Sequence, residues 1–195
     1  MYEIITKALR SLVDFSEEEL LQFLQKLKPR QLKRGEHVLT AGEVCRAMVL
    51  VESGSLRYYA AAEKGEQSFW FCFEGEWLGD YGSFLARRPS LHYLQALEDS
   101  RVFYLYREDM EDLYAKGAKF ERFGRLIAEH LFLSTEQSRH ELVTLPAERR
   151  YLNLVERHPK IIQRVAQQHI ASYLGIQPQS LSRIRSKLSN PEKLT

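Results

Sequence analysis

The spacing of apolar residues changes twice along the chain, and these changes divide it into three parts. Before Pro29 and after Arg107, apolar residues recur every three or four positions, which is the period of a helix with one buried face. Between Lys33 and Arg107, short runs rich in Val, Tyr, Phe and Trp are separated by glycines, as strands are separated by turns. The pattern therefore predicts helices, then an antiparallel β-structure, then helices again.

The first predicted helix has a recognisable start and stop. Ser16 and Glu19 have the spacing of a capping box, in which each side chain accepts a hydrogen bond from the other residue's backbone N–H. The apolar residues that follow have helical spacing, and Pro29 ends the pattern. We expect residues 16–28 to form a helix.

Five short runs in the middle of the chain have the composition of strands. The turns between them recur at about ten-residue spacing, which is typical of an antiparallel sandwich or a small β-barrel. The predicted strands are residues 47–52, 56–61, 68–73, 93–98 and 101–106.

A long apolar helix is predicted after the strands. Residues 108–113 are expected to form a short helix, and residues 120–142 contain no proline and only one glycine. The apolar residues of the longer segment cover more than one face, so this helix needs two partners. One partner can be the β-structure and the other a second copy of the helix in a homodimer; alternatively, one subunit buries the helix completely. Pro146 is expected to start a further helix that ends near Val155.

The segment from Gln167 to Ser186 has the spacing of a helix-turn-helix. Gly175 stands where the chain has to reverse, because glycine readily adopts the left-handed conformation that ends a helix. Apolar residues that can pack the two helices together flank it on both sides: Ile170, Ala171, Leu174, Ile176, Leu181 and Ile184.

The outward face of the second helix carries hydrogen-bond donors suited to DNA. Its polar residues are Gln179, Ser180, Ser182, Arg183, Arg185 and Lys187. No acidic residue occurs between Gln163 and Asn190, whereas a solvated helix face usually mixes both signs of charge. DNA binding is therefore the leading hypothesis, and a helical hairpin that serves only for packing is the alternative.

The distribution of charge agrees with a DNA-binding C-terminal part. The chain has 195 residues, a hydrophobic content of 44% and a formal net charge of +2. Residues 146–195 hold nine Lys or Arg against three Glu, while residues 1–145 hold 19 against 23 acidic residues. A basic C-terminal part attracts phosphate, and an acidic N-terminal part repels it, so the two parts have different roles.

Other classes of protein lack support in the sequence. No apolar run is long enough to span a membrane, and residues 1–19 do not resemble a signal peptide, so we expect a cytoplasmic protein. Cys45 and Cys72 are too few for a thiolate cluster, and we expect both to be buried thiols in strands. No catalytic or metal-binding motif is recognisable, so neither an enzyme nor a metal site is predicted.

The order of these parts resembles the Crp/Fnr family of bacterial transcription regulators. The residues that carry the resemblance are Gln167–Ser186 and the segment Phe73–Asp80, FEGEWLGD. The resemblance implies an α+β protein with a jelly-roll type antiparallel β-barrel, flanking helices, a long dimerisation helix and a helical C-terminal domain. The implied domains are residues 1–118, 119–144 and 145–195. It further implies a homodimer that binds double-stranded DNA and contacts RNA polymerase.

The resemblance also assigns roles on the second helix of the hairpin. Gln179 and Arg183 fall on base-reading positions, and the implied phosphate contacts are Ser180, Ser182, Arg185 and Lys187. Pro178 differs from the arginine that some members have, so the half-site sequence of those members does not carry over.

The effector is left open by the sequence. The resemblance places the effector pocket at Gly79, Asp80, Ser90, Leu91, Ser134 and Thr135. Ser90 stands where relatives that bind cyclic AMP have the arginine that pairs with the phosphate. The alternatives are cyclic AMP, another small effector or an empty pocket, and His37, His92 and His130 are candidate haem ligands. His92 could also hydrogen-bond a ligand or face solvent. A barrel that acts through protein contacts instead of DNA is the alternative function.

Overall fold

The computed structural model describes residues 3–63 and 65–189 of the chain. These residues form two compact units. Of the described residues, the first unit contains 3–60 and 70–132, and the second contains 61–63, 65–69 and 133–189.

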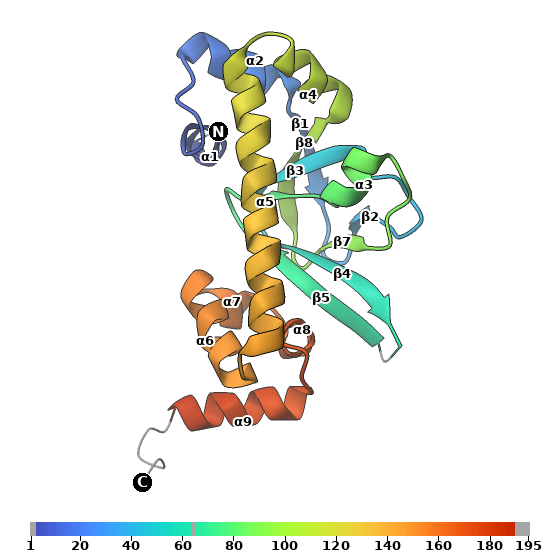
Figure 1. The fold of residues 1–195 in the computed structure, drawn as a ribbon, viewed down its shortest axis with the longest axis vertical. Coiled ribbons are helices and arrows are strands. Elements are labelled where there is room, and N and C mark those ends of the chain that lie inside the picture. Colours follow the sequence, from blue (N-terminus) through green and yellow to red (C-terminus); the bar gives the residue numbers. More distant parts are fainter. Residues whose placement is uncertain (1–2, 64, 190–195) are drawn as a thin grey trace. The chain divides into compact units, whose positions relative to one another are not determined.

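Eight strands pair into two four-stranded antiparallel sheets in the described part of the chain (Figure 1). In one sheet the order is β1 (Lys28–Leu32), β8 (Ser100–Tyr106), β3 (Ala47–Ser53) and β6 (Trp77–Leu78). In the other it is β2 (His37–Leu39), β7 (Tyr93–Ala96), β4 (Leu56–Ala62) and β5 (Gly65–Cys72). The five predicted strands are present as β3, β4, β5, β7 and β8.

The strands that the sequence predicts are those with buried side chains. In β3, the first five residues are all buried, and Val102, Phe103 and Leu105 of β8 are completely buried beside them. Strand β1 was not predicted, because four of its five residues are exposed, and these four are polar residues and a proline. Strands β2 and β6 are too short, with three and two residues, to show any period.

Helices cover the first unit. They are α1 (Glu3–Arg10), α2 (Glu17–Lys26), α3 (Tyr81–Ala86), α4 (Arg107–Tyr114) and the first part of α5 (Ala118–Thr144). The capping box of α2 is confirmed: Ser16 N donates to Glu19 Oε2 at 2.7 Å, and Glu19 N donates to Ser16 Oγ at 3.2 Å. The short helices α1 and α3 were not predicted.

An aromatic cluster packs α2 against α5. The rings of Phe23 and Phe123 meet edge to face at 4.8 Å, and Phe120 stacks on Phe15 at 5.4 Å. Gly124 is required beside this cluster, because a Cβ atom there would lie 1.8 Å from the Tyr114 hydroxyl oxygen. The start of the long helix is thereby fixed to the first unit.

The prediction for the cysteines is partly wrong. Cys72 is completely buried in β5, as expected. Cys45 is buried too, but it lies in the loop before β3, where its thiol contacts the backbone oxygen of Ala47. The loop replaces a strand here because the Cys45 N–H donates to the Ser83 side chain instead of to a neighbouring strand.

The second unit is mostly helical. After the end of α5 come α6 (Ala147–Arg157), α7 (Ile161–Arg164), α8 (Gln167–Tyr173) and α9 (Pro178–Ser189) (Figure 1). The α+β class, with antiparallel sheets, a long helix and a helical C-terminal part, is confirmed. The limits proposed for three domains stay a prediction. Among the described residues, no helix is long and apolar enough to cross a membrane.

Candidate DNA-reading hairpin and nucleotide cassette

Helices α8 and α9 form the predicted hairpin, and its turn is a Schellman motif. Gly175 has φ of +64°, Ile176 N donates to Ala171 O at 3.0 Å, and Gly175 N donates to Ser172 O at 3.0 Å. The packing residues Ile170, Ala171, Leu174 and Leu181 are buried, as predicted. Helix α9 is therefore held in a defined orientation on α8.

The outward face of α9 exposes several of its predicted DNA contacts to solvent. Gln179 and Arg183 are exposed and so is Ser182, whereas Ser180 and Arg185 are partly buried. The ammonium group of Lys187 forms an ion pair of 3.0 Å with Glu148 at the start of α6. The sequence did not indicate this ion pair, which joins residues 39 positions apart.

Polar side chains fix the hairpin to the end of α5. The Arg150 guanidinium donates to Leu145 O and to Leu174 O, each at 2.6 Å, so it bridges the last turn of α5 and the last turn of α8. A second link is the ion pair of 2.8 Å between Arg157 of α6 and Glu141 of α5, whose side chain is buried. The first link therefore connects α8 with the end of α5, and the second connects α6 with α5.

The β4–β5 hairpin contacts α8 inside the second unit. Ser172 Oγ donates to Glu66 O at 2.6 Å and accepts from Ser68 N at 2.8 Å, and the Gln67 amide donates to Ser172 O. Ser172 of α8, the first helix of the helix-turn-helix, thus forms hydrogen bonds with three consecutive residues of β5.

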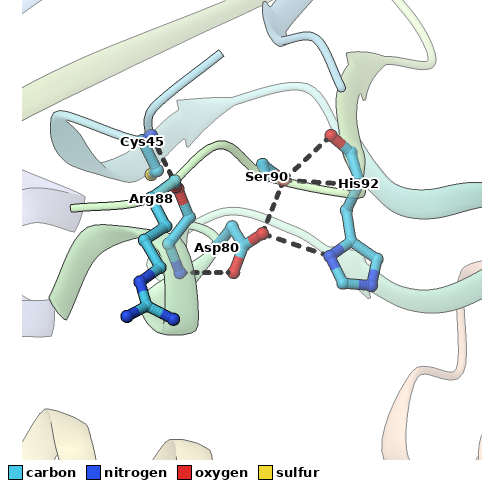
Figure 2. Close-up of polar contacts among 6 residues, drawn as sticks. Cys45, Asp80, Arg88, Ser90 and His92 are labelled. Atoms are coloured by element: carbon cyan, nitrogen blue, oxygen red, sulfur yellow. Dashed lines mark hydrogen bonds and ion pairs between the residues drawn. The ribbon is translucent and has the colours of Figure 1, made fainter. Parts of the chain in front are cut away.

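The second candidate site is the segment Gly79–His92, which is here called the cassette. At its centre, the Asp80 carboxylate accepts hydrogen bonds from three residues of the segment. Its Oδ1 accepts from Ser83 N at 3.0 Å and so caps α3, while its Oδ2 accepts from Ser90 Oγ at 2.5 Å (Figure 2). The Nδ1 atom of His92 lies 3.1 Å from the same Oδ2. Asp80 is 6% exposed and Ser90 2% exposed, so these contacts are shielded from water.

Backbone contacts hold the rest of the cassette. Ser90 N donates to Glu43 O, and Gly42 N donates to Ser90 O, both at 2.8 Å. Ser83 Oγ donates to Arg88 O at 2.6 Å and accepts from Cys45 N at 3.0 Å. The loop before β3 and the cassette are therefore one hydrogen-bonded assembly.

The surroundings of Asp80 favour its charged form. Burial alone would raise the pKa of Asp80, but hydrogen bonds from His92, Ser90 and Ser83 outweigh it and lower the pKa from 3.8 to about 2. Burial, with a smaller contribution from the charge of Asp80, raises the pKa of Tyr58, whose ring lies 4.6 Å from that of His92. The cassette thus contains a buried carboxylate, and the Tyr58 phenol stays neutral.

The structure brings only some of the predicted pocket residues together. Asp80 and Ser90 are hydrogen-bonded, and a Cβ atom on Gly79 would lie 2.5 Å from the Met48 sulfur, so this glycine is needed for packing. The side chain of Leu91 is 79% exposed. Ser134 and Thr135 belong to the part of α5 in the second unit.

A cavity of about 410 Å³ also opens in the first unit. It is lined by residues of β1, β2, β7 and β8 and of the loop before β3, among them Arg30, Leu94 and Tyr104. None of the residues that line it belongs to the Asp80, Ser90 and His92 cluster.

The structure also bears on the candidate haem ligands. The side chain of His37 has a partner within the protein, since its Nε2 lies 3.0 Å from the Tyr59 hydroxyl oxygen. Among the described residues no group of three His, Cys, Asp or Glu could hold a metal ion.

Comparisons with known proteins define the class of protein first. Residues 29–116, which include most of the strands and the whole cassette, match the cyclic nucleotide-binding domain family. The structure is similar to that of FixK2 from Bradyrhizobium japonicum, with a TM-score of 0.70 and 18% identity over 85% of this chain and 86% of that one. It is equally similar to CLP of Xanthomonas campestris, a c-di-GMP responsive global regulator: the TM-score is 0.70 and the identity 19% over 91% and 93%.

A curated relative agrees with these structures. The chain is 25% identical to the fumarate and nitrate reduction regulatory protein of Vibrio cholerae, over 91% of this chain and 74% of that protein. The resemblance to Crp/Fnr regulators is therefore confirmed as a similarity: residues 29–116 match the cyclic nucleotide-binding domain family, and the curated relative and the structural neighbours are regulators of the Crp/Fnr type. These relatives are transcription regulators and not enzymes.

Proposed function

We propose that the chain is a homodimeric, sequence-specific DNA-binding regulator of transcription whose helix α9 enters the major groove. The observation that carries this proposal is the exposed polar face of α9 on a helix fixed at its turn and by the buried Leu181. A recognition helix needs both properties, because side chains can read base edges only when the helix that carries them has a defined orientation.

The residues of α9 have different roles in this proposal. Arg183 pairs with the two acceptors of guanine, and Gln179 with adenine, each adding about 1 to 3 kcal/mol of discrimination between bases. Ser180, Ser182 and Arg185 contact phosphates and set the register on the duplex. Lys187 adds a further phosphate contact by exchanging its ion pair with Glu148 for the DNA backbone.

Exposed apolar residues on α5 support the homodimer. The side chains of Phe132 and Leu133 are 66% and 65% exposed, and that of Val143 is 79% exposed. Such residues on a long helix mark a surface for another molecule, and a second copy of α5 supplies a matching apolar surface by symmetry. The dimer acts in the cytoplasm and contacts RNA polymerase, and its N-terminal domain is the place for regulation.

A salt titration tests the DNA-binding proposal. The affinity for a fluorescent duplex of random sequence is measured by anisotropy between about 50 and 200 mM salt. We expect the logarithm of the association constant to fall linearly with the logarithm of the salt concentration, because cations on the protein release counterions from the phosphates. Absence of binding, or binding that does not respond to salt, would favour a domain that acts through protein contacts.

A further inference from the structure

The domain family implies a cyclic nucleotide as ligand, and such a ligand sets a clear requirement on the cassette. A cyclic nucleotide carries a negative phosphate, and a phosphate that leaves water needs a cation and several donors in the protein. The cassette instead presents the buried carboxylate of Asp80, which is held in its charged form. An ionised carboxylate accepts hydrogen bonds and donates none, so Asp80 cannot supply the contacts that a phosphate needs.

The donors at the centre of the cassette are already in use. The Ser90 hydroxyl donates to Asp80 and accepts from His92 N at 2.9 Å, and the Ser90 N–H donates to Glu43 O. The Nδ1 atom of His92 contacts Asp80. A nucleotide phosphate would have to break several of these contacts at once, because Ser90 is almost completely buried.

The arginines of the cassette do not supply the missing cation. Arg87 is exposed and pairs with Glu111 of α4 at 3.3 Å. Arg88 is exposed, and its side chain turns away from Ser90 and His92 in Figure 2. Neither of these two arginines therefore supplies a cation for a cyclic phosphate at Ser90.

We infer that the hydrogen bonds among Asp80, Ser90 and His92 keep the cassette closed and leave no place in it for a cyclic phosphate. The domain accordingly does not bind cyclic nucleoside monophosphates, and its cassette is held in one conformation without them. If the chain binds DNA as proposed above, this closure makes DNA binding independent of cyclic nucleotides. That consequence rests on the proposed function, whereas the closure of the cassette does not rest on it.

Calorimetry on the full chain tests the exclusion of nucleotides. Cyclic AMP and cyclic GMP are titrated to about 1 mM, with a cyclic AMP-binding protein measured under the same conditions as positive control. We expect no saturable heat for this chain. Saturable binding of either nucleotide would overturn the inference, whatever the outcome of the DNA measurements.

Hydrogen exchange tests the closure itself. The amides of Ser90 and His92 donate to Glu43 O and Ser90 Oγ within the closed cassette, so their exchange reports its opening. Asp80→Asn and the milder His92→Gln should each speed their exchange at least about fivefold, while Asp14→Asn, at an exposed site, should not. A smaller rise in both variants would overturn the inference.

The DNA measurement separates the two claims. Anisotropy with and without about 1 mM cyclic AMP should give DNA affinities that agree within about twofold, since a ligand that does not bind has no coupling to a second site. Absence of DNA binding under all conditions would refute the proposed function and leave the closure to the other two experiments. A larger change caused by cyclic AMP would refute the closure.

Discussion

Replacing Asp80 by asparagine gives a stability effect whose size and pH dependence follow from the cassette. The pKa of Asp80 falls from 3.8 to about 2 in the folded protein. The carboxylate therefore stabilises the folded state by about 2 kcal/mol at neutral pH, since one pKa unit corresponds to about 1.4 kcal/mol. Because the folded pKa is lowered, this contribution is complete well above pH 3.8 and is lost as the pH falls towards 2.

Tryptophan fluorescence offers a suitable assay, because both tryptophans, Trp70 and Trp77, belong to the first unit. Urea unfolding of wild type and Asp80→Asn should differ by about 2 kcal/mol at pH 7 and by roughly half of that at pH 3. Asp14→Asn serves as the control, since Asp14 is an exposed aspartate. A difference at pH 7 below about 0.5 kcal/mol, or one that stays constant down to pH 3, would refute the reasoning about Asp80.

Three further predictions concern the second unit and the long helix. Arg183→Ala should reduce the preference for a selected duplex over a random one by about 10- to 100-fold in a competition assay, and equal losses on both would show that Arg183 contacts only phosphate. Phe132→Glu should convert a dimer to a monomer in sedimentation analysis, because a charge cannot be buried in an apolar interface; a persisting dimer would place the interface elsewhere. Ser172→Ala should speed exchange of the Ser68 amide by about fivefold, corresponding to about 1 kcal/mol, because the hydroxyl is its acceptor; unchanged exchange would show that this contact does not hold the β-hairpin.

The elements that the sequence predicts well are those with local signals. The capping box at Ser16 places α2, and the glycine at 175 with its apolar flanks places the turn between α8 and α9. Strand β1 carries no such signal, since its sequence KPRQL is mostly polar and it is recognisable only by its pairing with β8. Helix α3 is too short for a visible period and ends at Arg87 in a left-handed conformation that favours glycine.

The candidate sites were predictable to different degrees for the same reason. Outward residues on α9 follow from helical spacing, so Gln179 and Arg183 could be identified as exposed. In the cassette, the resemblance to Crp/Fnr regulators implied that Ser90 stands where relatives that bind cyclic AMP have an arginine. The sequence did not show that the His92 ring contacts Asp80. These two residues are 12 positions apart, and the path of the loop between them decides whether their side chains meet. The same limit applies to the ion pair between Arg157 and Glu141, whose partners lie on different helices.

In-vitro selection from a library of random duplexes tests the central claim most directly. A homodimer with α9 in the major groove should enrich an inverted repeat whose half-sites lie about 10 base pairs apart from centre to centre, or a multiple of that distance, because two symmetric helices meet successive turns of the duplex. Enrichment of such a repeat by the wild type, and its weakening in Arg183→Ala, is the predicted result. A library that stays random after selection, or that converges on a single asymmetric site, would contradict the account of this chain as a dimeric reader of DNA.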